Sequence, residues 1–388
     1  MKAWQRSRRL GGYAALVLGL AGTALSGAGT AQAGVIPTQH AVVVWGGHSN
    51  FTPQQLASSA GVVQVSAGGA HNLVLKSDGT VWARGNNWFG QLGNGTGTAS
   101  STLIQVPGLT GVVQVSAGGF HSLALRSDGT VWEWGLWGPA DYLTPTEVPG
   151  LTGVTKIAGG DGFSLALRSD GTVWAWGNNY YGDLGDGTTN ASSVPVQVSG
   201  LSQVTSIAAG IDSALAIRTQ GITTVKTVWA WGGNSSGQLG DGTLGNHLTP
   251  EQVTGIKAPS VMGISVGQKF AVALGSDGSV WAWGADDVGQ LGNAPTASPV
   301  TRPVETTGMD SGITQVSAGT NHVLALKSNG TVLAWGDNSG GELGTGSTAS
   351  VAGAVQVSGL ASVTQVSAGA GYSLAIHPAQ LVSLPSQA

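Results

Sequence analysis

Three histidines recur at one position of a repeated phrase and could together hold a metal ion. His71, His121 and His322 each lie three residues after a glycine that recurs through the chain. Neutral imidazole is a common zinc ligand. In the other copies the same position is filled by Phe163, Ser213, Phe270 and Tyr372. A position that accepts Phe as readily as His favours packing, so we expect these histidines to be hydrogen-bonded between strands.

Aspartates in glycine-rich loops could bind Ca²⁺, which prefers oxygen ligands. They are Asp186, Asp241, Asp286 and Asp287. Their spacing matches neither an EF-hand loop nor a nonapeptide calcium repeat. Asx-turns, in which the side chain bonds the backbone two residues on, explain the pattern. We therefore predict no metal and no cofactor.

The chain also lacks the marks of several enzyme classes. It contains no P-loop and no His-Glu-x-x-His motif, and it has no Cys for thiolate chemistry or disulfides. We find no convincing catalytic pair of carboxylates and expect a protein that is not an enzyme. An enzyme with its site at the mouth of a central channel is the alternative.

Composition excludes an ordinary helical or α/β enzyme body. Gly accounts for 65 of 388 residues and charged residues for 9%, whereas each Gly inside a helix costs about 1 kcal/mol relative to Ala. A hydrophobic content of 41% with 14 Trp also argues against disorder. The net charge is −4 and no basic run occurs beyond the N-terminus, which argues against a nucleic-acid partner.

One unit recurs along the chain, and its consensus is Val-Ser-Ala-Gly-x-x-His-x-Leu-Ala-Leu-x-Ser-Asp-Gly-Thr-Val-Trp-Ala-Trp-Gly. The glycine at its Ala-Gly step occurs seven times, at Gly68, Gly118, Gly160, Gly210, Gly267, Gly319 and Gly369. The chain opens with a Trp-Gly half at Trp45 and closes with an Ala-Gly half over 365–376. Two half-units complete one unit only if the ends meet, which predicts a closed ring rather than an open solenoid.

Within the unit, large and small side chains alternate as they do in strands, for example over 131–134. The Ser-Asp-Gly-Thr segment at 127–130 is a hairpin signal, because Asp-Gly supplies the positive φ of a tight turn. Apolar segments at 104–106 and 112–115 complete four strands in about 50 residues. We predict an all-β fold, a seven-bladed β-propeller of four-stranded antiparallel blades, with the last blade closed by the N-terminal strand.

The repeat resembles that of the regulator-of-chromosome-condensation family over roughly residues 41–377. The resemblance includes Gly-Gln-Leu-Gly steps at 90–93, 237–240 and 289–292, with variants at 182–185 and 341–344, whereas blade 2 lacks the step. It implies a seven-bladed propeller but no single function. Members include a nuclear exchange factor for a small GTPase, a plant ultraviolet-B receptor and a secreted bacterial inhibitor of β-lactamases. In that inhibitor the residue before the repeated His is often aromatic, and here only Phe120 is aromatic at that position.

Aromatic residues indicate where such a propeller would bind. The first and third loops of a four-stranded meander emerge on the same face of the ring. On three consecutive blades these loops carry Trp88, Phe89, Phe120, Trp137, Tyr180 and Tyr181. Aromatic residues are frequent interface anchors, so we predict a patch that binds a protein or a glycan. The alternative is that these rings fold back over the blades.

Two charged residues break the repeat at core positions. Arg84 replaces a Trp on blade 1, and Glu133 replaces an Ala on blade 2. If the bulky face of each blade packs on the small face of the next, the two side chains meet as a buried or half-buried pair. If stacking runs the other way, each charge reaches solvent separately.

Residues 1–33 are typical of a secretory signal peptide, with a basic start, an apolar stretch and an Ala-Gln-Ala cleavage site ending at Ala33. A lead at 34–40, the propeller at 41–377 and a tail at 378–388 follow. We expect a secreted bacterial protein, monomeric and free of the membrane after cleavage. It would bind an extracellular protein or a cell-wall glycan, and a β-lactamase-inhibitor-like function is a further alternative.

Overall fold

In this computed structural model the described residues are 40–57, 59–137, 140–219, 221, 225–294, 299–309 and 312–378. The expected signal peptide at 1–33 lies outside them, as do 34–39 of the lead and 379–388 of the tail. The described residues belong to one compact unit. Its described elements are all strands, and no described helix could cross a membrane.

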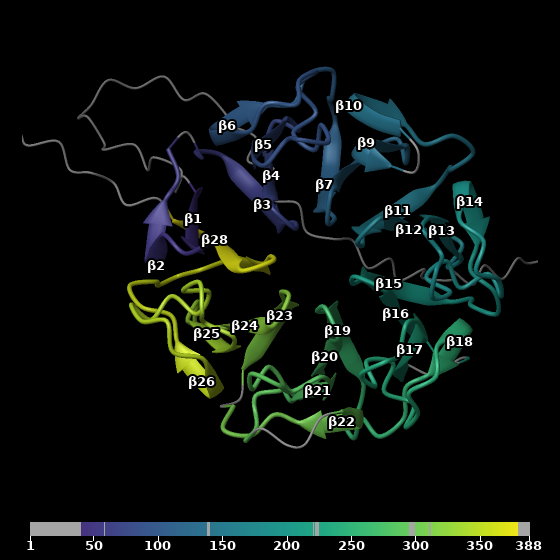
Figure 1. Cartoon of the computed structure of the whole chain (residues 1–388), viewed down its shortest axis with the longest axis vertical. Helices are drawn as coiled ribbons and strands as arrows, with labels where there is room; N and C mark the ends of the chain where they lie inside the picture. The colour runs from purple at the N-terminus through teal and green to yellow at the C-terminus, as the bar shows by residue number, and fades with distance from the viewer. Residues whose placement is uncertain are drawn as a thin grey trace, which may run out of the picture. The chain divides into compact units, whose positions relative to one another are not determined.

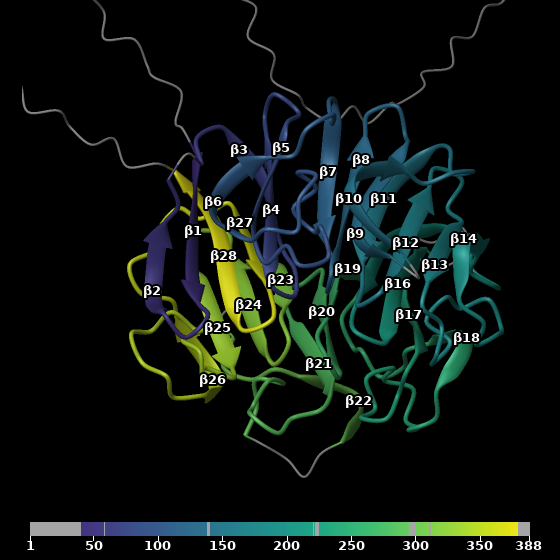
Figure 2. The ribbon, with the colours of Figure 1, turned by 45° about the horizontal axis from the view of Figure 1, so that its top comes forward.

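Seven four-stranded antiparallel sheets are arranged around one axis, as Figures 1 and 2 show. Blades 1 and 2 are β3 (Val62–Ala67), β4 (His71–Lys76), β5 (Val81–Gly85), β6 (Ser100–Gln105), then β7 (Val112–Ala117), β8 (His121–Arg126), β9 (Val131–Trp137), β10 (Ala140–Glu147). Blades 3 and 4 are β11 (Val154–Gly159), β12 (Phe163–Arg168), β13 (Val173–Gly177), β14 (Ser192–Gln197), then β15 (Val204–Ala209), β16 (Ser213–Thr219), β17 (Lys226–Gly232), β18 (His247–Gln252). Blades 5 and 6 are β19 (Val261–Val266), β20 (Phe270–Gly275), β21 (Val280–Gly284), β22 (Val300–Glu305), then β23 (Ile313–Ala318), β24 (His322–Lys327), β25 (Val332–Gly336), β26 (Val351–Gln356). Blade 7 is β27 (Gln365–Ala368), β28 (Tyr372–Pro378), β1 (His40–Gly46), β2 (Asn50–Gln55).

Blade 7 joins the two ends of the chain. Strand β1 pairs with β28 over its whole length, with Val44 opposite Leu374, and it pairs with β2 on its other side. In Figure 1 the purple β1 lies beside the yellow β28. The predicted seven-bladed propeller, closed by its N-terminal strand, is confirmed.

Side chains of the inner strands tie neighbouring blades together around the channel. The Gln64 amide donates to the Val115 carbonyl over 3.1 Å, and its carbonyl accepts the Val115 amide over 2.9 Å. The same reciprocal pair joins Gln365 to Val65 across the junction of the chain ends. These bonds satisfy backbone groups that an inner edge strand would otherwise leave unpaired. They fix the spacing between the inner strands of neighbouring blades.

The bulky face of each blade packs on the small face of a neighbouring blade. The neighbour is not the one that would bring Arg84 and Glu133 together. Trp176 of blade 3 is fully buried against Leu123, Leu125 and Val131 of blade 2. In blades 2 to 7 the tryptophan of the Trp-Gly step therefore packs on the small face of the preceding blade, not of the next.

Candidate binding site

The first and third loops of each blade lie together on one side of the ring, here called the loop face. Backbone bonds connect the two loops within a blade, as from Asn86 N to Ala70 O (2.8 Å) and from Asn178 N to Gly162 O (2.8 Å). The loop before the second strand and the loop after the third strand of a blade therefore lie side by side.

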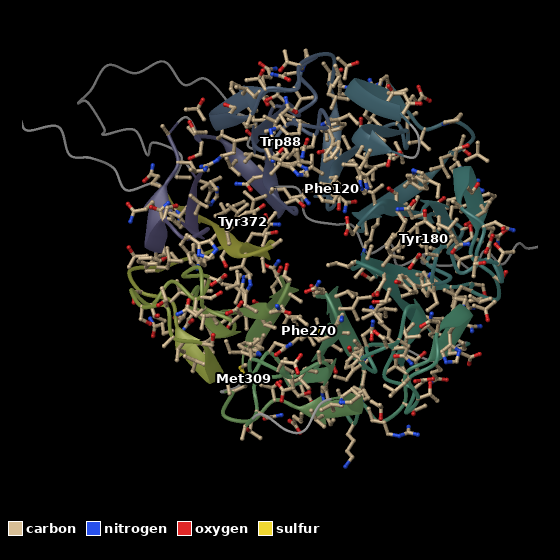
Figure 3. All side chains as sticks on the ribbon, in the orientation of Figure 1. Trp88, Phe120, Tyr180, Phe270, Met309 and Tyr372 are labelled. Atoms are coloured by element: carbon tan, nitrogen blue, oxygen red, sulfur yellow. The ribbon has the colours of Figure 1, made fainter. Side chains whose placement is uncertain are left out.

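Four of the predicted binding residues project into solvent from this face. The side chains of Trp88 and Tyr180 are 76% and 77% exposed, and those of Tyr181 and Phe120 are 49% and 42% exposed. Figure 3 shows Trp88, Phe120 and Tyr180 on blades 1, 2 and 3. Aromatic residues are enriched at protein interfaces relative to the rest of the surface.

Phe89 and Phe120 meet across the boundary between blades 1 and 2. Their ring centroids are 5.5 Å apart at an interplanar angle of 75°, an edge-to-face contact. This contact fixes Phe120 at the rim of the channel. Trp137 ends β9, and its side chain lies outside the described residues. We call Trp88, Phe89, Phe120, Tyr180 and Tyr181 the aromatic patch.

The loop face is also acidic. Its described first and third loops carry one Lys and no Arg, namely Lys269, and nine acidic side chains, of which Asp183, Asp286 and Glu342 are buried and Asp161, Asp186, Asp212, Asp241, Asp287 and Asp337 are not. Burial raises the pKa of Asp183 to about 7. Burial, with the neighbouring Asp212 carboxylate, also raises the pKa of Asp161. Asp161 lies on blade 3, which carries Tyr180 and Tyr181, and Asp212 lies on blade 4, so aromatic and acidic side chains occupy neighbouring loops.

The opposite side of the ring has a different character. Cations at the ends of the second strands lie over tryptophan rings, with centroid distances of 4.1 to 5.8 Å. The pairs are Lys76 over Trp82, Arg126 over Trp132, Arg168 over Trp174 and Arg218 over Trp229. These cations already have aromatic partners within their own blades.

A cavity of about 350 Å³ opens at the centre of the ring, on the side of the loop face. Its lining is mostly backbone and small side chains of the repeated glycine steps, together with Phe120. Asp161 is the one carboxylate among its described lining residues.

In blades 1, 3, 4, 5 and 6 a Gly-x-Leu-Gly step joins the blade to the next one. In blade 1, Gly90 and Gly93 have φ of +82° and +66°, values that favour glycine. They turn Leu92 into the core, where it is fully buried, and leave the Gln91 carbonyl to accept Trp134 Nε1 of blade 2 over 2.9 Å. Equivalent indole-to-carbonyl bonds start from Trp45, Trp231, Trp283 and Trp335.

Blade 2 lacks this step, and Glu133 replaces its carbonyl. Glu133 Oε2 accepts Trp176 Nε1 over 2.8 Å, and Oε1 accepts the Ser164 hydroxyl over 3.0 Å. In blade 1 the Gln91 carbonyl accepts both equivalent groups, Trp134 Nε1 and the Ser122 hydroxyl. One carboxylate therefore reproduces the acceptor that the shortened loop no longer supplies. Burial raises the pKa of Glu133 to about 7.

The predicted Arg84–Glu133 pair is wrong, because the stacking direction turns the two side chains to different neighbours. Glu133 faces blade 3, whereas Arg84 faces blade 7, where the charge of its guanidinium interacts with Tyr372. Arg84 is half-buried and its Nε has no hydrogen-bond partner within the described residues. Sequence reasoning missed that both departures accompany a missing Gly-x-Leu-Gly step: Glu133 stands on blade 2, which lacks the step, and Arg84 stands on blade 1, which follows blade 7, where it is also missing.

The repeated histidines are fully buried between blades. Their Nε2 atoms lie within hydrogen-bond distance of serine hydroxyls of the following blade, in the pairs His71–Ser122 (2.8 Å), His121–Ser164 (3.0 Å) and His322–Ser373 (2.9 Å). Burial lowers the pKa of His71 to about 3 and those of His121 and His322 to about 4. Each is therefore a neutral, structural side chain at neutral pH.

The loop aspartates form local turns. Asp186 and Asp241 accept the backbone amides of Thr188 and Thr243, each over 2.9 Å. Across the described residues, no group of three or more His, Asp or Glu side chains is arranged to hold a metal ion.

The sequence of this chain is similar to a family model and to parts of several known proteins. A family model for the RCC1-like domain matches residues 24–375. The human E3 ubiquitin-protein ligase HERC2 is 31% identical over 172 residues, which are 43% of this chain and 4% of that protein. The Arabidopsis thaliana ultraviolet-B receptor UVR8 is 35% identical over 122 residues, 31% of this chain and 27% of the receptor. The chain thus matches only a minor part of each of these relatives.

Solved structures share the fold at lower identity. Prp20p from Saccharomyces cerevisiae, whose binding properties to Gsp1p and histones were reported with its structure, aligns with a TM-score of 0.77 at 22% identity, over 88% of this chain and 92% of that one. Human WBSCR16 aligns with a TM-score of 0.78 at 22% identity, over 88% of this chain and all of that chain. At this identity the likeness concerns the propeller fold.

Proposed function

Because this chain belongs to the RCC1-like domain family, we propose that it is a binding protein that holds a protein partner on its loop face. The observation that carries this proposal is the exposure of Trp88 and Tyr180 on one side of a rigid ring. Prp20p and its complex with Kap60 show that propellers of this fold take protein partners. Rigid aromatic anchors gain affinity because little side-chain entropy is lost when they are covered.

The charge of the loop face suggests the chemistry of that partner. Six acidic side chains that are not buried, against Lys269, would attract a surface rich in Lys and Arg, and the exposed rings of Trp88 and Tyr180 would accept cations over their faces. We expect the association rate to fall as salt is added, because screening weakens long-range attraction.

The proposed place of action rests on residues 1–33, which resemble a secretory signal peptide. We propose that the protein is exported and acts outside the cell as a monomer, on an extracellular protein. A cell-wall glycan is the competing partner, because exposed aromatic rings also stack on sugars.

A retention experiment on the exported form, residues 34–388, tests the proposal. The chain is immobilised and exposed to secreted proteins, to cell-wall glycan fragments and to a purified β-lactamase. The patch variant Trp88→Ala/Tyr180→Ala is compared with a control, Val113→Ala/Met262→Ala. Val113 and Met262 are 54% and 63% exposed, and both lie near the start of an inner strand, at the end away from the loop face.

A stoichiometric protein that the patch variant loses and the control keeps supports the proposal. Retention of glycan alone would change the partner class, and turnover of a substrate without a retained partner would favour the enzyme alternative. Equal retention by both variants would contradict the assignment of the loop face.

A further inference from the structure

A cavity of about 380 Å³ lies at the boundary between blades 2 and 3. Among the described residues it is lined by Glu133, Tyr142, Thr146, Glu147, Val148, Pro149 and Ser193. Five lining residues belong to the outer strand of blade 2 or the turn after it, and Ser193 belongs to the outer strand of blade 3. The cavity is distinct from the channel and from the aromatic patch.

The repeat shows what fills this space in other blades. Leu184 of the blade 3 loop is fully buried against Val198, which follows the outer strand of that blade. Val148 is the counterpart of Val198, because both amides bond the first carbonyl of the third strand, Val131 O and Val173 O. The cavity therefore occupies the space that the missing Gly-x-Leu-Gly loop of blade 2 would fill.

The polar side of the cavity is a carboxylate without a cation. Glu133 is only 5% exposed, and both groups that donate hydrogen bonds to it, the Ser164 hydroxyl and the Trp176 indole, are neutral. His121 Nε2 lies 3.8 Å from Glu133 Oε1, but burial keeps that imidazole neutral at pH 7 by lowering its pKa to about 4. No Lys or Arg of the described residues forms an ion pair with Glu133, and Glu147 adds a second carboxylate to the lining.

The remaining lining suits an aliphatic chain. Val148 and Pro149 supply apolar walls, and the ring of Tyr142 packs beside the core of the preceding boundary. A carboxylate at the end of an apolar cavity matches an alkyl stem that ends in a cation, because the stem gains from leaving water and the cation gains a buried counter-charge.

We propose that this cavity is a binding site for an alkylammonium group, such as the side chain of a lysine presented by another molecule. The site does not depend on the aromatic patch and would exist even if the loop face bound nothing. Ammonium binding requires ionised Glu133, so affinity should rise with pH through about 7, where burial has raised the pKa of this carboxyl. His121, Tyr142 and Glu147 are the other titratable groups nearby, and the imidazole of His121 stays neutral across that range.

The indole N–H of Trp176 provides a direct reporter, because it donates to Glu133. Its NMR resonance, assigned by its loss in Trp176→Phe, is followed during titration of the exported chain with N-acetyl-lysine methylamide. N-acetyl-norleucine methylamide has the same alkyl stem without the charge and is the matched ligand control. We expect a saturable shift with the lysine compound and about tenfold weaker binding of the norleucine compound, a difference of about 1.4 kcal/mol.

Two variants complete the test. Glu133→Gln keeps an oxygen acceptor but removes the charge, and it should abolish the preference for lysine while the indole resonances stay dispersed. Glu251→Gln, on the exposed outer strand β18 of blade 4, should leave the titration unchanged. The proposal fails if the Trp176 resonance does not move, if norleucine binds equally well, or if Glu133→Gln keeps the preference. Stronger binding of an arginine analogue would assign the site to guanidinium groups instead.

Discussion

Trp176 Nε1 donates to Glu133 Oε2 over 2.8 Å, and this bond joins blades 2 and 3 where a backbone carbonyl serves at other boundaries. Blade 2 has no Gly-x-Leu-Gly loop, and an acid at a core position supplies the acceptor in its place.

Glu133→Gln should change the pH dependence of stability. Burial raises the pKa of Glu133 from 4.5 to about 7, so the folded state holds its proton more tightly than the unfolded state. The linked stability is full below pH 4.5 and is lost as pH rises through 7. The variant should therefore gain stability relative to the wild type between pH 5 and 8, by up to about 3 kcal/mol at 1.36 kcal/mol per pKa unit. Urea unfolding of both proteins at pH 5 and at pH 8 measures the difference in unfolding free energy. A difference that is the same at both pH values would contradict the prediction.

His322→Phe should make the protein less sensitive to acid. Burial lowers the pKa of His322 from 6.5 to about 4, so its contribution is present above pH 6.5 and is lost as pH falls through 4. Phe163 and Phe270 show that the position accepts Phe. At neutral pH the variant loses the bond to Ser373, about 1 kcal/mol, and it should regain that deficit in acid. A constant deficit at every pH would show that His322 does not titrate on unfolding.

Arg84→Met should stabilise the boundary between blades 7 and 1. The Nε of Arg84 is buried without a hydrogen-bond partner within the described residues, and burial lowers the pKa of its guanidinium. Met keeps an unbranched stem without the unsatisfied donor, so we expect a gain of about 1 kcal/mol in unfolding free energy. Arg126→Met is the control, because Arg126 bonds the Thr110 carbonyl and should gain nothing. A loss of stability in Arg84→Met would point to an ion or water that holds this side chain.

Closure of the ring can be tested by a cross-link. Ala41 of β1 lies opposite His377 of β28, and the chain contains no natural Cys. Ala41→Cys/His377→Cys should form a disulfide on oxidation and raise the melting temperature, since closing a loop of this length contributes up to about 5 kcal/mol. Free thiols after oxidation would mean that the two strands are not neighbours. Ala41→Cys combined with Val113→Cys, on another blade, should stay unlinked.

The repeat alone was enough to predict the propeller, its blade order and its closure. The alternation of large and small side chains indicates strands, and the half-units containing Trp45 and 365–376 can complete one unit only in a ring. The predicted exposure of Trp88 and Tyr180 also agrees with the structure, because loop order fixes the face on which these loops emerge.

The stacking direction could not be deduced in the same way. A tryptophan face can bury itself equally well on the blade before or after it, so the pattern alone left the neighbour of Arg84 open. Only the twist of the strands sets the choice, and it turns Glu133 towards Trp176. A usable signal was present, because the acid stands on a blade that lacks its own Gly-x-Leu-Gly step.

The central claim is that the loop face binds the partner, and one affinity comparison tests it most directly. The dissociation constant of the isolated partner is measured for the wild type, for Trp88→Ala/Tyr180→Ala and for Val113→Ala/Met262→Ala. We predict a loss of about 100-fold or more for the first variant, as expected for two interface anchors, and no change for the second. Equal affinity of all three proteins would contradict the account.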